Sequence, residues 1–224
     1  MHATLDISTD ATHDVLRRRL RKAIAGHSVA QHSRGEYPAT DDFLSSTSRH
    51  LAAVSAAIVP AARKQLDDGA ERAKELVQQS RHLELAMAKL KARLYGEAHV
   101  AQITWGELWT DARDELERTL ELERRLVDDL LARLDDDHAD ELAGRLYHAE
   151  LHAPTRPHPY APHVGLTGRV ARRVLTTVDH FWDTTEGRMV PEPVRPRDHT
   201  HDGLLTHYLL ADPDPVPEGE EQAD

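Results

Sequence analysis

The stretch from Leu116 to Leu134 has the clearest pattern of hydrophobic and polar positions in the chain. Its apolar residues recur at helical spacing: Leu116, Leu120, Val127, Leu130 and Leu134. This spacing places them on one face of an α-helix, which should face a core. The middle of that face holds Glu123, and Thr119 lies one turn before it. A buried carboxylate is costly unless it is paired, hydrogen-bonded or bound to a metal, so this helix carries either a structural polar contact or part of a site.

Helical periodicity recurs along the chain and predicts five amphipathic helices in its first two thirds. They run over about residues 10–32, 42–66, 70–95, 105–134 and 138–152. Residues 1–10 are predicted to be a disordered lead, and Pro60 should kink or break the second helix. We find no convincing strand.

The composition changes after residue 152. Residues 153–164 are rich in proline and histidine and favour an extended linker. Residues 165–187 have the pattern of an amphipathic helix, and residues 188–224 are a flexible tail rich in proline and acidic residues. The prediction for residues 1–152 is an all-α, up-down-up-down four-helix bundle with a short fifth helix. The C-terminal arm would carry one further helix.

Charge and cysteine content narrow the function classes. The chain has 224 residues, a formal net charge of −11 and no cysteine. The negative charge disfavours nucleic acid and anionic membranes as partners. The lack of cysteine excludes disulfides, thiolate metal sites and thiol catalysis. A polar, acidic N-terminus and the lack of a long apolar run predict neither a signal peptide nor a membrane span, so we expect a cytoplasmic location.

A polar group lies at or near the core-facing side of each of the four long helices. The set is His13, His50, His82 and Glu123. Bundles that hold iron or related metals project histidines and carboxylates inward in this way. For His13 and His50 the alternative is a core histidine hydrogen-bonded to its neighbours, and for His82 a partly exposed helical residue. For Glu123 the alternative is internal pairing, with Arg17, Arg49 or a core histidine as partner.

These positions resemble the hemerythrin-like (HHE cation-binding) family over residues 8–152. The segment HDVLRRRL (13–20) is similar to that family's first helix, which opens with a ligand histidine. HLAAVSAAIVP (50–60) is similar to its second-helix pattern, and His82 matches its third-helix histidine. The fourth helix of the family carries a histidine followed four residues later by a glutamate, where this chain has Thr119 and Glu123. The resemblance implies a four-helix bundle with an iron site.

Two positions depart from the family's ligand set. Val54 stands in place of the second-helix carboxylate, and Thr119 stands in place of the fourth-helix histidine. Too few groups therefore remain to hold two irons. His13, His50, His82 and Glu123 are a reasonable set for a single ion, with iron the first expectation.

Two function hypotheses from different classes follow. The first is a degenerate hemerythrin-like protein that binds one metal ion, or none, and serves iron, oxygen or redox sensing or storage. The second is a metal-free helical interaction or regulatory protein, whose partner, another protein or a second copy of this chain, would dock through the C-terminal arm. The sequence has no nucleophile motif and no glycine-rich phosphate loop, so an enzyme is not indicated. An enzyme with a single iron that acts on oxygen or peroxide is a third alternative without a substrate signal.

Overall fold

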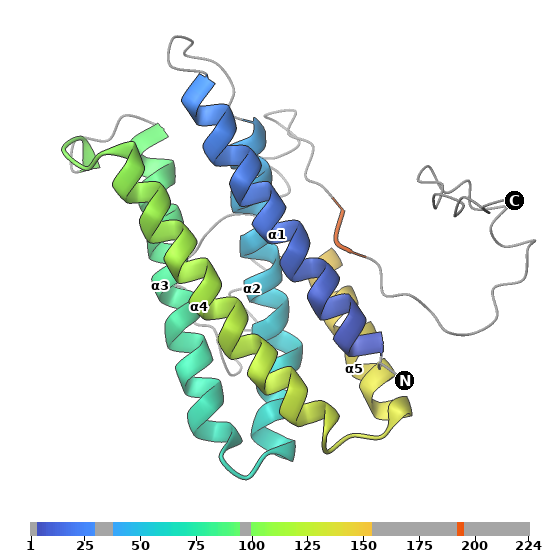
Figure 1. The fold of residues 1–224 in the computed structure, drawn as a ribbon. Helices are drawn as coiled ribbons and strands as arrows, with labels where there is room; N and C mark the ends of the chain where they lie inside the picture. Colours follow the sequence, from blue (N-terminus) through green and yellow to red (C-terminus); the bar gives the residue numbers. More distant parts are fainter. Residues whose placement is uncertain (1–3, 30–37, 95–99, 154–191, 195–224) are drawn as a thin grey trace, which may run out of the picture.

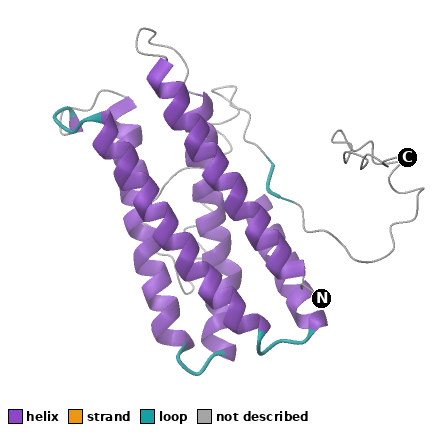
Figure 2. Cartoon of the chain, viewed as in Figure 1, coloured by secondary structure: helices purple, strands orange, loops and turns teal. Residues whose placement is uncertain are grey.

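The computed structural model describes residues 4–29, 38–94, 100–153 and 192–194. These residues form five α-helices and include no strand (Figures 1 and 2). The helices are α1 (Thr4–Val29), α2 (Pro38–Gln65), α3 (Gly69–Leu94), α4 (Trp105–Leu131) and α5 (Asp136–Leu151). The all-α prediction is therefore confirmed over this part of the chain, whereas the hemerythrin type of bundle stays a prediction.

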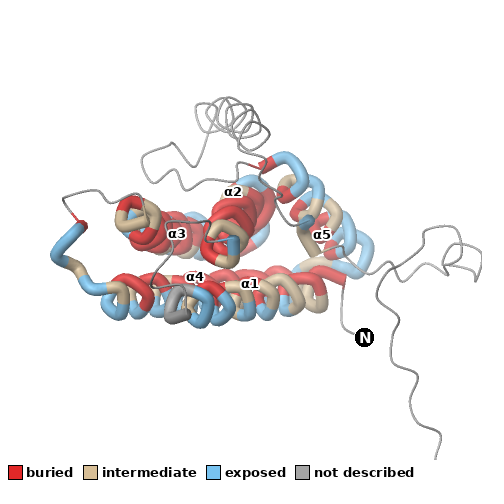
Figure 3. Tube along the Cα trace, turned by 90° about the horizontal axis from the view of Figure 1, so that it is seen from above, coloured by how far each residue is buried: buried red, intermediate tan, exposed pale blue. Residues whose placement is uncertain are grey.

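The five helices pack in two layers, and α2 is the central helix of one of them (Figure 3). Seen from above, α3, α2 and α5 form one row and α4 and α1 the other, with buried residues between the rows (Figure 3). Helix α2 contacts all four other helices, and α4 packs mainly against α3. The fifth helix is thus part of the packed body, beside α2 and α1.

Helix α4 forms as its sequence pattern predicts, except that it ends at Leu131, three residues before the predicted end at Leu134. Thr104 caps its N-terminus in a capping box with Glu107, which satisfies backbone donors of the first turn. Leu116, Leu120, Val127 and Leu130 are all buried. Between them Glu123 is fully buried as well, so the polar interruption of the apolar face lies inside the core.

The core consists of two hydrophobic clusters with a polar layer between them. One cluster contains Leu5, Ile58, Leu76 and Val127, and the other contains Leu16, Phe43, Leu83 and Leu120, among other residues. Each long helix contributes to both clusters, and within a few residues of the boundary between its two contributions it places a buried polar residue. These residues are His13, His50, Ser80 and Glu123. A polar layer of this kind needs partners for its donors and acceptors, because no bulk water reaches it.

Two sequence predictions were wrong, one about where the first helix begins and one about the effect of Pro60. Helix α1 begins at Thr4, within the predicted disordered lead, because Leu5 is fully buried in the core and Asp6 pairs with Arg124 of α4. Helix α2 runs through Pro60 without a break. Pro60 and Ala56, whose carbonyl group loses its helical donor, are both exposed, so water can replace the lost hydrogen bond.

The predicted linker (153–164), amphipathic helix (165–187) and tail (188–224) lie outside the described residues, apart from Ala153 and residues 192–194. None of the described helices combines the length and the apolar character that a membrane crossing requires.

Candidate metal centre

His13 of α1, His50 of α2 and Glu123 of α4 meet inside the polar layer. Each residue offers one ligand atom, and these atoms lie within 4.8 Å of one another. His50 Nε2 lies 2.9 Å from Glu123 Oε2, and His13 Nε2 lies 3.2 Å from the same oxygen. All three side chains are buried. Three different helices thus bring three metal-binding side chains together, so the group could hold an ion.

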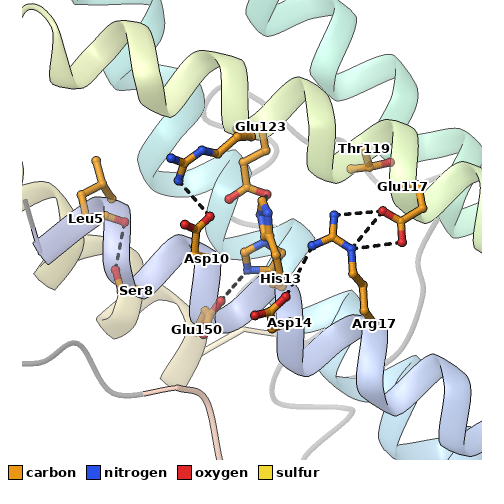
Figure 4. Close-up of polar contacts among 12 residues, drawn as sticks. Leu5, Ser8, Asp10, His13, Asp14, Arg17, Glu117, Thr119, Glu123 and Glu150 are labelled. Atoms are coloured by element: carbon orange, nitrogen blue, oxygen red, sulfur yellow. Dashed lines mark hydrogen bonds and ion pairs between the residues drawn. The ribbon is translucent and has the colours of Figure 1, made fainter. Parts of the chain in front are cut away.

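A second carboxylate reaches His50 from α5. Glu150 Oε1 lies 2.6 Å from His50 Nδ1, and Glu150 is itself buried. Figure 4 shows Glu150 on the side of the cluster opposite to Glu123. His50 is therefore hydrogen-bonded at both ring nitrogens, to Glu123 through Nε2 and to Glu150 through Nδ1.

The charges of these groups determine their protonation. Burial opposes a charge on His50, but the Glu123 and Glu150 carboxylates outweigh burial and raise the pKa of His50 to about 10. Burial also acts to raise the pKa of Glu123, but the positive charge on His50 and the nearby His13 outweigh it, so the pKa of Glu123 lies well below its usual value. Without a metal ion, His50 is therefore an imidazolium that donates to both carboxylates.

Two atoms of the group that could bind a metal ion have no hydrogen bond within the described part of the chain. They are His13 Nε2 and Glu123 Oε1, both buried. His13 Nε2 is at ion-pair distance from Glu123 Oε2, but the angles do not make a hydrogen bond. Buried polar atoms are almost always satisfied by protein, water or an ion. These two atoms are ones that a bound cation would satisfy.

The fourth predicted ligand, His82, is not part of the group. Its side chain is exposed on α3, whereas Ser80 and Glu84 are the polar residues that α3 buries there. Of the predicted set, the structure therefore brings together His13, His50 and Glu123. The partners of Glu123 are the two core histidines and not Arg17, which pairs with Glu117 of α4 at 2.9 Å (Figure 4).

The sequence analysis missed Glu150. The signal was present, because Glu150 follows Leu146 by four residues and Leu142 by eight, which places it on the buried face of α5. Glu150 therefore interrupts an apolar helix face in the same way as Glu123.

The residues present do not fit a two-metal centre. Val54 is buried and has no donor atom. The Thr119 hydroxyl donates to the Glu115 carbonyl of its own helix at 2.7 Å. The two positions at which the resemblance expects further ligands thus supply neither a carboxylate nor an imidazole, and the donor set suits one ion.

Comparison with known proteins returned no match to a family model, to a curated protein or to a solved structure. The resemblance to the hemerythrin-like family therefore stays a prediction from the sequence.

Proposed function

We propose that this protein binds a single divalent metal ion through His13, His50 and Glu123. The observation that carries the proposal is the convergence of these three buried side chains from α1, α2 and α4, with His13 Nε2 and Glu123 Oε1 lacking a hydrogen-bond partner in the described part of the chain. Two imidazoles and one carboxylate form a donor set that iron(II) and zinc(II) accept.

Iron is the ion we propose, for a role in oxygen, redox or iron sensing or storage. A two-histidine, one-carboxylate set leaves coordination positions open, which is typical of non-haem iron sites. A ferrous ion held there would supply redox chemistry and a binding position for a small ligand. His13 and His50 would hold it as neutral imidazoles, Glu123 would neutralise part of its charge, and the flanking hydrophobic clusters would exclude water. In this proposal the helices form a degenerate hemerythrin-like, up-down-up-down bundle.

Elemental analysis tests the proposal directly. The protein is produced without a histidine tag in iron-supplemented medium, and iron, zinc and manganese are measured per chain. We expect close to one equivalent of metal. His50→Ala should abolish loading, whereas the matched control His82→Ala, which changes an exposed histidine, should retain it. Less than a tenth of an equivalent in the unaltered protein would refute metal binding.

A metal-free role is the second candidate, and one observation favours it. His50 is hydrogen-bonded to Glu123 and Glu150 directly, so both of its ring nitrogens have partners without an ion. In that case the layer is a structural network, and the protein acts as an interaction or regulatory protein. The same elemental analysis separates the two candidates.

A further inference from the structure

Helix α5 lies beside α2 and α1 and contributes none of the three proposed ligands, yet it reaches the centre with one side chain. Its buried face runs through Leu142, Ala143 and Leu146 and ends in Glu150. The other acidic side chains of this helix, such as Glu141, are exposed. One carboxylate of α5 has therefore been taken out of water, and burying it is costly unless its partner is well placed.

That partner is His50, at 2.6 Å between Glu150 Oε1 and His50 Nδ1. A hydrogen bond this short between buried, charged groups fixes the plane and direction of the imidazole ring. It also commits Nδ1 to carrying a proton. When a metal ion replaces the other ring proton, the lone pair that binds the ion is on Nε2, the nitrogen that faces Glu123.

We propose that Glu150 is a positioning residue that makes His50 bind metal through Nε2, so that α5 completes the metal centre. This inference rests on the proposed metal binding and adds a role for a fifth helix. Histidines that bind metals commonly donate their other ring N–H to a carboxylate, and loss of that carboxylate weakens metal binding by roughly 10–100-fold.

The surroundings of Glu150 support this role. Burial lowers the pKa of both Arg19 and Arg49, and the negative charge of Glu150 opposes that shift in each. Glu150 is therefore close enough to both guanidinium groups for its charge to act on them. Arg19, Arg49 and His50 thus place positive charge around this carboxylate, which accepts the hydrogen bond from His50 Nδ1–H.

The test compares three variants in the full chain with zinc(II) as the diamagnetic probe. Glu150→Leu removes the acceptor, Glu150→Gln keeps an amide oxygen that can accept from Nδ1, and Glu141→Gln is the matched control on the exposed face of the same helix. Zinc affinity is measured by titration against a competing chelator. We expect Glu150→Leu to bind zinc roughly 10–100-fold more weakly, Glu150→Gln to recover much of that loss, and Glu141→Gln to match the unaltered protein.

Nitrogen-15 NMR of the zinc-loaded protein shows which ring nitrogen of His50 binds zinc. This choice of nitrogen would not change if Glu150 only stabilised the fold. The unaltered protein should show His50 bound to zinc through Nε2 with a proton on Nδ1, and Glu150→Leu should show a mixture of the two ring nitrogens as ligands. Circular dichroism confirms that each variant is folded, and Glu150→Ala, which also removes the acceptor, replaces Glu150→Leu if that variant does not fold.

The failures of the two proposals are distinguishable. If the unaltered protein binds no metal, the proposed function is refuted and the role of Glu150 with it. If the unaltered protein binds zinc and the Glu150 variants bind it equally well through Nε2, only the role of Glu150 is overturned.

Discussion

Glu123 is the residue whose charge holds the polar layer together. It is fully buried between His13 and His50, with no arginine or lysine among its ion-pair partners in the described part of the chain. A buried carboxylate persists only because its partner carries the opposite charge and supplies hydrogen bonds. Here that partner is the His50 imidazolium, which Glu150 stabilises from its other side.

Replacing Glu123 by glutamine in the metal-free protein should be strongly destabilising. The change keeps the shape but leaves His50 with one carboxylate fewer, and breaking a buried ion pair costs about 3–5 kcal/mol. Chemical denaturation in the presence of a chelator measures the free energy of unfolding. The control is Glu121→Gln on the same helix, whose exposed pair with Arg125 should cost at most about 0.5 kcal/mol. Equal costs for the two changes would contradict this account.

The stability of the metal-free protein should depend on pH through the same groups. The pKa of His50 is raised from 6.5 to about 10 on folding, so its contribution is complete below pH 6.5 and is lost as the pH rises towards 10. The pKa of Glu123 is lowered on folding, so its contribution is present above the ordinary glutamate range and is lost as the pH falls below it.

We therefore expect maximal stability between about pH 5 and 6.5, and a decline on the order of a few kcal/mol from pH 6.5 to 10. Urea denaturation at a series of pH values measures this decline. The variant His50→Gln should be less stable throughout but should lack most of the alkaline decline. An unchanged alkaline slope in that variant would show that other groups cause it.

At the scale of the element, the burial of the N-terminal turns of α1 and of the middle of α2 depends on tertiary packing more than on their own sequence pattern. Leu5 lies in the core although the residues around it are polar. In α2, every residue from Phe43 to Ser55 except Ala52 is buried, including a run of serine, threonine and arginine side chains. A helix buried on every side is normally apolar throughout. In this helix the buried hydroxyl groups of Ser45 and Ser46 need hydrogen-bond partners, and both donate to backbone carbonyls of α2 itself.

The burial of Leu5 gives a direct test of the first turns of α1. Leu5→Ala should destabilise the protein by about 2–5 kcal/mol, because it leaves a cavity in a packed cluster. The matched control is Leu151→Ala in α5, where the leucine is 41% exposed, and this change should cost no more than about 0.5 kcal/mol. Thermal or urea unfolding compares the two. A Leu5→Ala variant as stable as the control would mean that the N-terminal turns do not dock.

At the scale of the whole molecule, the proposed ion would join three helices at the boundary between the two hydrophobic clusters. Helices α1, α2 and α4 each contribute one ligand, and the clusters lie on either side of that layer. An ion that binds only the folded chain stabilises it by mass action, by about 2.7 kcal/mol at a hundredfold excess over the dissociation constant. The whole body should therefore respond to metal as a unit.

Zinc at that excess should raise the thermal midpoint by roughly 5–10 °C, as expected for a chain of this size. Differential scanning calorimetry measures the shift. His50→Ala should abolish it, and His82→Ala should leave it unchanged. A shift that persists in His50→Ala would assign the effect to exposed histidines elsewhere in the chain.

The sequence by itself determined that there are five helices over the described residues, apart from some of their ends, and it indicated three members of the polar layer, His13, His50 and Glu123. Helical periodicity depends on residues three and four apart, so the apolar face of residues 116–134 and the inward direction of His13, His50 and Glu123 could be read from local spacing. Helix α5 was predicted for the same reason. Glu150 could have been read in this way, since it continues the face of Leu142 and Leu146.

Only the tertiary structure decided which of these side chains meet. His50 and Glu150 are 100 residues apart in the chain, and His50 and Glu123 are 73 apart, so no local pattern pairs them. His82 is a case in which local spacing predicted a contact that does not form. The packing of α3 buries Ser80 and Glu84 and leaves this histidine exposed. The docking of Leu5 likewise depends on a core built by other helices. Spacing along one helix specifies a face, whereas contact between faces depends on how all five helices pack.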